Sequence, residues 1–475
     1  MIFAFLFAMI FPQLARAATI TVSNTNNSGT GSLRQAIADA ASGDTINFSI
    51  SGTIILTTGE LIIDKNLTVD GSGQSIALSG GNTSSIIRIN TGNIGMTVSL
   101  ISLTLQDSAN TAVSNDGTLT ITNCTFSNNG GLSTVILGGA IHNDGILRIS
   151  GSTFSNNRAN SSSSIAEGGA IYNQGTMNIT DSTFSNNSVD GSVSPRGGAI
   201  LNHSVGTTTI ANSTFSSNEV DHYFISGPES LYGGAIHSMG ALVVTNSTFT
   251  GNHAHIEVQA GATDSDANAY GGAIYSNGSL TISNSTFSGN STTATASGQT
   301  ISSGGAVYGS TVNTTISNST FADNSVSANG STSLAFGGGI SSSGTLENSI
   351  FANNTGGDCT GPFSADAYNL DTDGSCNNAT QKTVAEIGLS PLADNGGPTQ
   401  TMAISNISAA YNAADNSVCQ AKDQRGVARP QYSRCDVGAY ELDSTSPLIE
   451  SDNIITPYST GPTSFTFGFI EDIYD

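Results

Sequence analysis

A pair of histidines and two nearby aspartates form the first candidate metal site in the sequence. His253 and His255 are separated by one residue, and Asp264 and Asp266 follow in the same segment. Alternating histidines can ligate a transition metal. Metal sites usually take three or more protein ligands, however, and no clear third ligand stands out. We therefore interpret the pair as solvated histidines in a polar loop and predict no metal, with a transition-metal site as the alternative.

Calcium is the second candidate ion. Asp371, Asp373 and Gly374 are spaced like part of a calcium-binding loop, in which carboxylates supply oxygen ligands. The downstream glutamate that completes an EF-hand is missing. We interpret the segment as a plain turn and expect no cofactor, with Ca²⁺ as the alternative.

Carboxylates for catalysis are sparse. Asp116 and Asp144 occupy equivalent positions, each between Asn and Gly, but Gln174 and Asn277 stand near that place in later copies. Polysaccharide lyases and glycoside hydrolases need clustered carboxylates, calcium ligands, or a basic residue near the abstracted proton. A lone Asp-Gly is more commonly a turn. We predict no catalytic residue and lean against an enzyme, although the sequence leaves that class open.

One further column is rich in aromatic residues. Each member directly follows a Gly-Gly-Ala-Ile block or a close relative, and the column reads His142, Tyr172, Leu201, His237, Tyr275 and Tyr308. If the preceding Ile points into a core, these side chains point outward and can stack on sugars or on a partner. The plainer alternative is that they only cover a sheet face, since isolated surface aromatics are normal. The candidate binding residues are therefore His142, Tyr172, His237, Tyr275 and Tyr308.

A short repeat must position these residues. It is defined by one Phe column, namely Phe126, Phe154, Phe184, Phe215, Phe249, Phe287, Phe321 and Phe351. Asn stands three residues after each Phe, and Ser stands two residues before it, except that Cys124 takes the first place. Ile or Val stands five residues before each Phe except in the last copy. Short strands with period-two alternation fit this spacing, interrupted by a bend that holds Asn, Gly or Asp.

The distances between repeated blocks separate a fixed segment from a variable one. From Ile141 to Phe154 and from Ile236 to Phe249 the step is 13 residues, whereas the step from a Phe to the next block varies. Variable insertions at one corner of a fixed period are typical of a solenoid. The long loops at that corner, residues 219–231 and 253–270, are the better candidates for a variable binding face.

Stacking is required because a single turn cannot bury its apolar side. Parallel strands about 4.8 Å apart place Ile on Ile and Phe on Phe, and let amides of the Asn columns bond along the stack. Cys124 fits as a small buried side chain in the Ser column.

Ser32 and Gln35 form a capping-box pattern before an apolar helical face at the start of the repeats. We predict an all-β, right-handed parallel β-helix with an N-terminal capping helix and a disulfide-containing C-terminal domain.

Composition limits the partners and the cellular compartment. The formal net charge is −23, which disfavours nucleic acid and anionic membrane surfaces. An apolar run before Ala15-Arg16-Ala17 resembles a signal peptide, and no later run is apolar enough to span a membrane. Export makes disulfides plausible among Cys359, Cys376, Cys419 and Cys435, although spacing does not fix their pairing.

The repeats resemble those of chlamydial polymorphic outer-membrane proteins and related bacterial adhesin β-helices. The resemblance rests on the GGAI blocks and the Phe-x-x-Asn columns, over about Gly138 to Asn354. The opening segment GSLRQAI is similar to the start of exported β-helix proteins of the CSLREA type. Residues 368–441 resemble the choice-of-anchor Q domain through NLDTDGSC, SPLADNGGPTQT, DQRGVARP and CDVGAYE. In that family the domain precedes varied surface-anchoring modules.

These observations lead to one reading of the whole chain. We expect a signal peptide at 1–17, an N-terminal cap at 18–50, β-helix repeats at 51–355, a choice-of-anchor Q-like domain at 356–441, and a tail or the start of an Ig-like module at 442–475. The expected function is adhesin-like binding of a polysaccharide or a cell-surface protein, outside the cell or on a bacterial cell surface such as the outer membrane. A polysaccharide lyase or glycoside hydrolase is the alternative.

Overall fold

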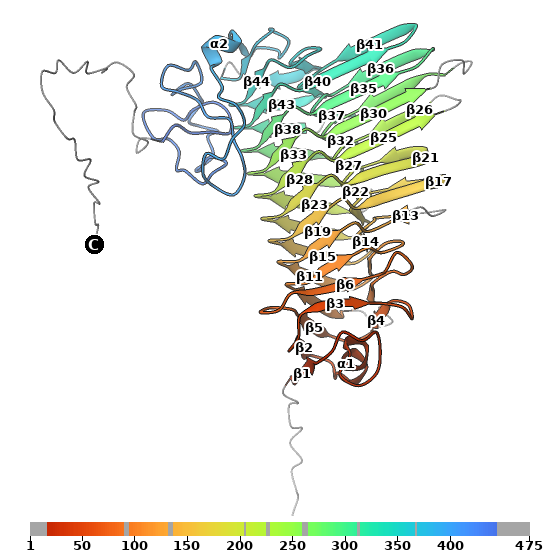
Figure 1. Cartoon of the computed structure of the whole chain (residues 1–475). Coiled ribbons are helices and arrows are strands. Elements are labelled where there is room, and N and C mark those ends of the chain that lie inside the picture. Colours follow the sequence, from red (N-terminus) through yellow and green to blue (C-terminus); the bar gives the residue numbers. More distant parts are fainter. Residues whose placement is uncertain are drawn as a thin grey trace, which may run out of the picture. The chain divides into compact units, whose positions relative to one another are not determined.

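A computed structural model gives the fold of residues 17–89, 95–131, 136–203, 206–224, 229–258, 265–310, 314–365 and 368–443. Three parallel sheets wind around one core, as the sequence predicts for a right-handed parallel β-helix (Figure 1). The expected signal peptide and the end of the expected tail, residues 1–16 and 444–475, lie outside the described residues. Among the described residues, no helix is long and apolar enough to cross a bilayer.

Sheet A is formed by the strand that precedes the first bend of each repeat. In stacking order it contains β1 Thr19–Val22, β2 Asp44–Phe48, β5 Leu67–Asp70, β8 Thr97–Ile101, β11 Thr118–Thr122, β15 Ile146–Ser150, β19 Thr176–Thr180, β23 Thr207–Ala211, β28 Ala241–Thr245, β33 Leu280–Ser283, β38 Thr314–Ser317, β43 Gly344–Glu347 and β46 Phe363–Ala365.

Sheet B carries the Phe column. It contains β3 Gly52–Ile55, β6 Ile76–Ser79, β9 Thr104–Gln106, β12 Thr125–Ser127, β16 Thr153–Ser155, β20 Thr183–Ser185, β24 Thr214–Ser216, β29 Thr248–Thr250, β34 Thr286–Ser288, β39 Thr320–Ala322, β44 Ile350–Ala352, β47 Leu370–Asp371 and β48 Thr380–Gln381.

Sheet C includes the strands that begin at the last residue of each Gly-Gly-Ala-Ile block or its close relative. It contains β4 Leu61–Ile63, β7 Ile87–Ile89, β10 Val113–Asn115, β14 Ile141–Asn143, β18 Ile171–Asn173, β22 Ile200–Asn202, β27 Ile236–Ser238, β32 Ile274–Ser276, β37 Val307–Gly309, β42 Ile340–Ser341 and β45 Cys359–Thr360.

The predicted columns form continuous stacks inside the helix. Phe126 and Phe154 have ring centroids 4.7 Å apart with planes 4° apart, and the stacking continues to Phe351. The bend residues Asn123 and Asp181 have φ values of 53° and 51°, in the left-handed region that Asn and Asp tolerate. Cys124 is buried as predicted, and burial raises the pKa of its thiol to about 11.

The buried Asn column satisfies backbone groups at the corner between sheets B and C. Asn187 donates to the Phe154 carbonyl and to Oδ1 of Asn218, at 3.0 Å and 2.9 Å. Its own Oδ1 accepts from the backbone and side-chain amides of Asn157. The same pattern repeats along the stack, which confirms the predicted amide ladder.

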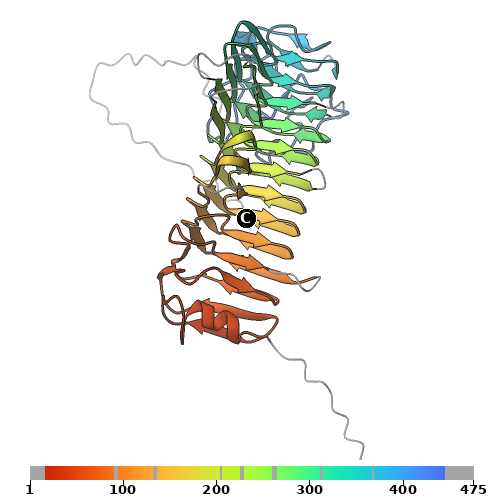
Figure 2. The same cartoon turned by 90° about the vertical axis from the view of Figure 1, so that its right-hand side faces the viewer.

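The variable corner is not a set of irregular loops, and this part of the prediction is wrong. The insertions form a fourth sheet, which we name the flange, with strands β13 Ile136–Leu137, β17 Arg158–Glu167, β21 Ser188–Arg196, β25 Glu219–Phe224, β26 Glu229–Tyr232, β30 His253–Val258, β31 Ala267–Tyr270, β35 Ser291–Thr295, β36 Gln299–Ser303, β40 Ser325–Asn329 and β41 Thr332–Phe336. Outgoing strands stack on outgoing strands and returning strands on returning strands, as successive rungs (Figure 2). Between them lies a separate buried cluster that includes Val220, Leu231 and Ile256.

Glycine pairs allow the flange to rejoin sheet C. Gly197 has a φ of 65°, and a Cβ added at Gly198 would lie 2.0 Å from the Gly234 carbonyl oxygen of the next turn. The first glycine of each pair therefore makes the turn, and the second allows two backbones to approach closely.

A helix covers the N-terminal end of the solenoid. The helix α1 Leu33–Asp39 begins after Ser32, whose side chain accepts from the Gln35 amide, and it buries Leu33, Ala36 and Ile37. At the other end the helix continues past the predicted boundary at residue 355, because β45, β46 and β47 extend sheets C, A and B. Disulfides join Cys359 to Cys376 and Cys419 to Cys435.

The segment that follows folds back over sheet B instead of forming a separate unit. It contains the short helix α2 Val384–Ile387 and otherwise turns. Gln424 accepts from the Thr286 hydroxyl at 2.7 Å and donates to that of Thr248 at 2.9 Å. The described residues up to Leu442 belong to one compact unit. In Figure 1 this segment and the flange lie on opposite sides of the solenoid.

Candidate functional site

The corner where the flange returns to sheet C brings two columns of side chains together. The first is the predicted column that starts at His142, and its members pair in register along sheet C. The second consists of the last residue of each returning strand, namely Leu137, Glu167, Arg196, Tyr232, Tyr270, Ser303 and Phe336. Because both columns run along the stack, they line one continuous corner.

Four tyrosines pack together in the middle of this corner, and we name Tyr232, Tyr270, Tyr275 and Tyr308 the tyrosine cluster. The Tyr232 and Tyr275 rings meet edge to face with centroids 4.7 Å apart. Tyr275 and Tyr308 are stacked at 5.3 Å, and Tyr270 lies 4.8 Å from Tyr308. Tyr275 is 8% exposed, whereas the other three are half-buried. The cluster therefore offers aromatic surface to solvent from a fixed base.

The hydroxyl groups of Tyr270, Tyr275 and Tyr308 remain neutral over a wide pH range, because their pKa values are raised. Burial raises the pKa of Tyr270 and of Tyr275 to about 12, and neighbouring tyrosines add to the shift. Burial also raises the pKa of Tyr308. Neutral phenols can donate as well as accept hydrogen bonds, which suits a ligand rich in hydroxyl groups.

The predicted column is less exposed than the sequence suggested. Tyr172 is 4% exposed and its ring packs against His142, while His237 is 2% exposed and packs against Tyr232 at the end of a returning strand. Burial holds the pKa of His237 well below its usual value, and neither ring nitrogen has a hydrogen-bond partner among the described residues. These two rings lie under the corner and cannot stack on a ligand, whereas His142 and Tyr308 are partly accessible.

A charged zone adjoins the aromatic one. Arg196 lies over the Tyr232 ring, 5.6 Å from its centroid, and its Nη1 is 3.6 Å from Oε1 of Glu167. Burial raises the pKa of Glu167, although Arg196 opposes the shift. His142 faces Asp144 at 3.3 Å. The zone thus places the carboxylates of Glu167 and Asp144 beside Arg196 and His142.

Tyr232 and Tyr270 are the members of the candidate site that sequence reasoning missed. Both directly precede a Gly-Gly pair, as do Glu167 and Arg196. Reading the residue before each block as carefully as the residue after it would have found this second column.

The two histidines of the first candidate metal site lie on the outer face of the flange. His255 Nδ1 is 2.9 Å from an oxygen of Asp221, and His253 Nδ1 is 2.6 Å from the Ser291 hydroxyl. Asp264 lies outside the described residues. In the part of the chain that the structure describes, no group of three or more His, Cys, Asp or Glu side chains is placed to hold a metal ion.

The candidate calcium segment begins at Asp371, the last residue of β47. Asp371 accepts from the Cys376 amide at 2.9 Å, and Asp373 accepts from the Asp358 and Ser375 amides. Most of these carboxylate oxygens thus accept hydrogen bonds from backbone amides, which is how Asp stabilises a turn.

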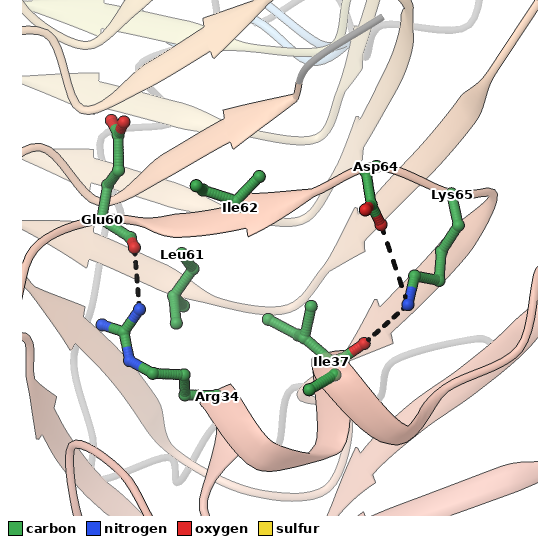
Figure 3. Close-up of a pocket in the computed structure, with 8 residues that line it drawn as sticks. Arg34, Ile37, Glu60, Leu61, Ile62, Asp64 and Lys65 are labelled. Atoms are coloured by element: carbon green, nitrogen blue, oxygen red, sulfur yellow. Dashed lines mark hydrogen bonds and ion pairs between the residues drawn. The ribbon is translucent and has the colours of Figure 1, made fainter. Parts of the chain in front are cut away.

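A separate cleft of about 460 Å³ lies between α1 and β4 (Figure 3). Arg34 crosses it to donate to the Glu60 carbonyl at 2.8 Å, and Lys65 donates to the Ile37 carbonyl at 3.2 Å. These cations fasten the capping helix to the first turn. The cleft thus lies where the capping helix contacts the first turn, and the tyrosine cluster remains the better candidate site.

Comparison with known proteins gives one family match. Residues 151–174 and 246–277 match the Chlamydia polymorphic membrane protein repeat. Both matched segments include the Phe column, and the second one spans Tyr270 and Tyr275. The match covers a small part of the chain, so it relates the repeats and not the whole protein to that family.

Comparison with curated proteins gives no match. Among solved structures, the pectate lyase Pel9A aligns over 90% of this chain and 96% of its own, with 13% identity and a TM-score of 0.36. An overlap this loose supports no argument about function.

Proposed function

We propose that this protein is an adhesin-like β-helix of the cell surface that binds a polysaccharide at the tyrosine cluster. The observation that carries the proposal is the set of half-buried Tyr232, Tyr270 and Tyr308 rings on the fixed base of Tyr275. Sugar rings stack on aromatic faces, and neutral phenols bond to sugar hydroxyls.

The corner favours an extended ligand. Successive rungs repeat at about 4.8 Å, so side chains of one type face the ligand several times along the stack. A repeating polymer can contact several rungs at once, and the effective affinity then exceeds that of a single contact. His142 and Tyr308 remain candidate contacts, whereas Tyr172, His237 and Tyr275 support the site from beneath.

Surface location is supported by the match of two segments to a membrane-protein repeat of Chlamydia. The two disulfides suit an oxidising compartment outside the cytosol. We propose export by the predicted signal peptide and an anchoring role for the choice-of-anchor Q-like segment.

The direct test is titration of the purified protein with a panel of polysaccharides, with product analysis on the same samples. We expect saturable binding of at least one polymer without release of reducing ends or unsaturated products. Cleavage of any polymer would replace the adhesin proposal with a lyase or hydrolase. Absence of binding across the panel would reject the proposal of a polysaccharide ligand and would favour a protein partner.

A further inference from the structure

The flange has one end that the rest of the described chain does not cover. Its sheet order runs from β40 at one terminus to β41 at the other, so the last rung presents two edge strands. The next turn, which begins at Thr355, passes without a flange insertion. It covers only the base of the rung, through Val326 to Thr355 and Gly337 to Gly356 backbone bonds. From Ser327 to Ala335 both edges are free of ladder partners within the described residues.

This end lacks the features that usually protect an edge strand. Natural proteins place lysine, proline or inward-pointing charges on such strands to prevent pairing with another chain. From Asn324 to Leu346 the sequence contains no charged residue and no proline, in a chain whose net charge is −23. Leu334 is 44% exposed, and all residues of β41 before Phe336 are exposed.

We infer that this flange end is an interface that pairs edge to edge with the same end of a second copy. Like charges normally keep two acidic molecules apart, but two uncharged rungs can meet without placing carboxylates in contact. At the opposite end of the flange, short β13 pairs only with the returning end of β17, and β17 carries Arg158 and Glu167. Head-to-head contact therefore buries no charge, whereas head-to-tail contact would bring these charges against an uncharged rung.

The geometry of the rung suits a twofold axis. An axis perpendicular to the two flange layers places β41 antiparallel on β41 of the second copy, and β40 likewise on β40. The two solenoids then lie on opposite sides, clear of the turn that continues past the flange. The two Leu334 side chains come together near the axis, where cross-strand pairs interact most closely. Such a contact is isologous and closes as a dimer instead of growing into a filament.

The small contact predicts weak association. Strands of five residues rise about 3.3 Å per residue and the layers are about 10 Å apart, so the buried area falls below that of a standard interface. We expect a dissociation constant on the order of 0.1 to 1 mM. Molecules crowded on one surface would still associate, because their effective concentration is in that range.

Sedimentation velocity over a wide concentration series tests the inference. We expect a concentration-dependent monomer–dimer equilibrium that Leu334→Lys weakens at least tenfold. Lysine lowers the net negative charge of the chain, so a weaker dimer cannot be attributed to greater general repulsion. Ile165→Lys is the matched control, because Ile165 lies in the flange and is also 44% exposed. This control variant should dimerise like the parent.

Hydrogen exchange locates the contact independently. Amides of β40 and β41 should gain protection as the concentration of the full chain rises, while amides of β17 should not change. A parent protein that stays monomeric at millimolar concentration would overturn the inference. So would open-ended oligomers, equal effects of the two lysine variants, or protection of β40 and β41 that appears only on addition of a foreign strand-forming peptide.

Discussion

Tyr275 and Tyr308 stack with ring planes only 2° apart, although they belong to different turns of the helix. The register of β32 and β37 places them directly side by side. A binding surface made this way depends on the precision of the stack, because each rung sets the ring position of the next. Predictions about the scaffold are therefore also predictions about the site.

The Asn ladder should be a major source of stability. Asn187→Ala removes two donated and two accepted hydrogen bonds, and it takes the side-chain acceptor away from the buried backbone amide of Asn157. Each unsatisfied buried group costs about 1–3 kcal/mol, so we expect a clear drop in the thermal midpoint. Ser185→Ala, two residues earlier in the chain and partly exposed, is the control. Equal midpoints for the two variants would show that the ladder is not stabilising.

The glycine pairs should tolerate no side chain at their second position. Gly198→Ala places a methyl group 2.0 Å from the Gly234 oxygen and 2.6 Å from the Glu219 nitrogen, both backbone atoms. We expect a loss of at least about 2 kcal/mol, measured by chemical denaturation.

Gly251→Asn provides the contrast. Its φ is 62° and the nearest atom to an added Cβ is 3.8 Å away, while Asn128 and Asn156 adopt the same backbone at equivalent places. This variant should retain parental stability. If it is as damaging as Gly198→Ala, steric crowding does not explain the glycine pairs.

The Asp221–His255 pair should make one histidine unusually basic. The hydrogen bond that His255 donates to the Asp221 carboxylate raises the pKa of His255, with burial opposing the shift. Because the folded-state pKa is raised, the pair contributes stability at low pH and loses it as pH rises through that pKa. Asp221→Asn should lower the His255 pKa in an NMR titration. An unchanged or higher pKa in the variant would rule out this origin of the shift.

The disulfide between Cys359 and Cys376 should hold the last turn of the helix. The cysteines are 17 residues apart in sequence, and closing a loop of that size contributes about 3 kcal/mol. Reduction should expose the amides of β45 and β47 to hydrogen exchange before those of β20. Uniform exchange across the helix would instead place the effect of the disulfide outside this turn.

The solenoid was predictable because its signals are large and repeated. Phe154 and its counterparts recur at fixed distances from Ile, Ser and Asn, so one alignment predicts strands, bends and buried ladders together. The capping helix followed from Ser32 and the apolar face behind it.

The flange was missed because its alternation is carried by small residues. Ala254, Ile256 and Val258 alternate with polar side chains, as a strand requires, but the segment is short and contains two histidines. Similar runs of Ser, Thr and Ala look like loops when read singly. They become strands because neighbouring rungs supply partners, and that information lies in the stack.

The C-terminal segment was harder to predict because it has little periodic structure. Arg425 pairs with Asp423 at 2.8 Å, and both are nearly buried. Contacts from Gln424 to Thr248 and Thr286 then join residues far apart in sequence. No local pattern predicts such pairs. The tyrosine cluster also joins residues from two separate columns, so neither column alone predicts it.

Binding by Tyr308→Ala, compared with Tyr432→Ala, tests the central claim most directly. Tyr308 is a half-buried member of the cluster, while Tyr432 is 46% exposed in the C-terminal segment, away from the corner. Calorimetric titration with the polysaccharide that the parent binds should show affinity at least about tenfold weaker for Tyr308→Ala, equal to about 1.4 kcal/mol. Tyr432→Ala should bind like the parent. Unchanged affinity in Tyr308→Ala, with the fold intact by circular dichroism, would contradict a polysaccharide site at the tyrosine cluster.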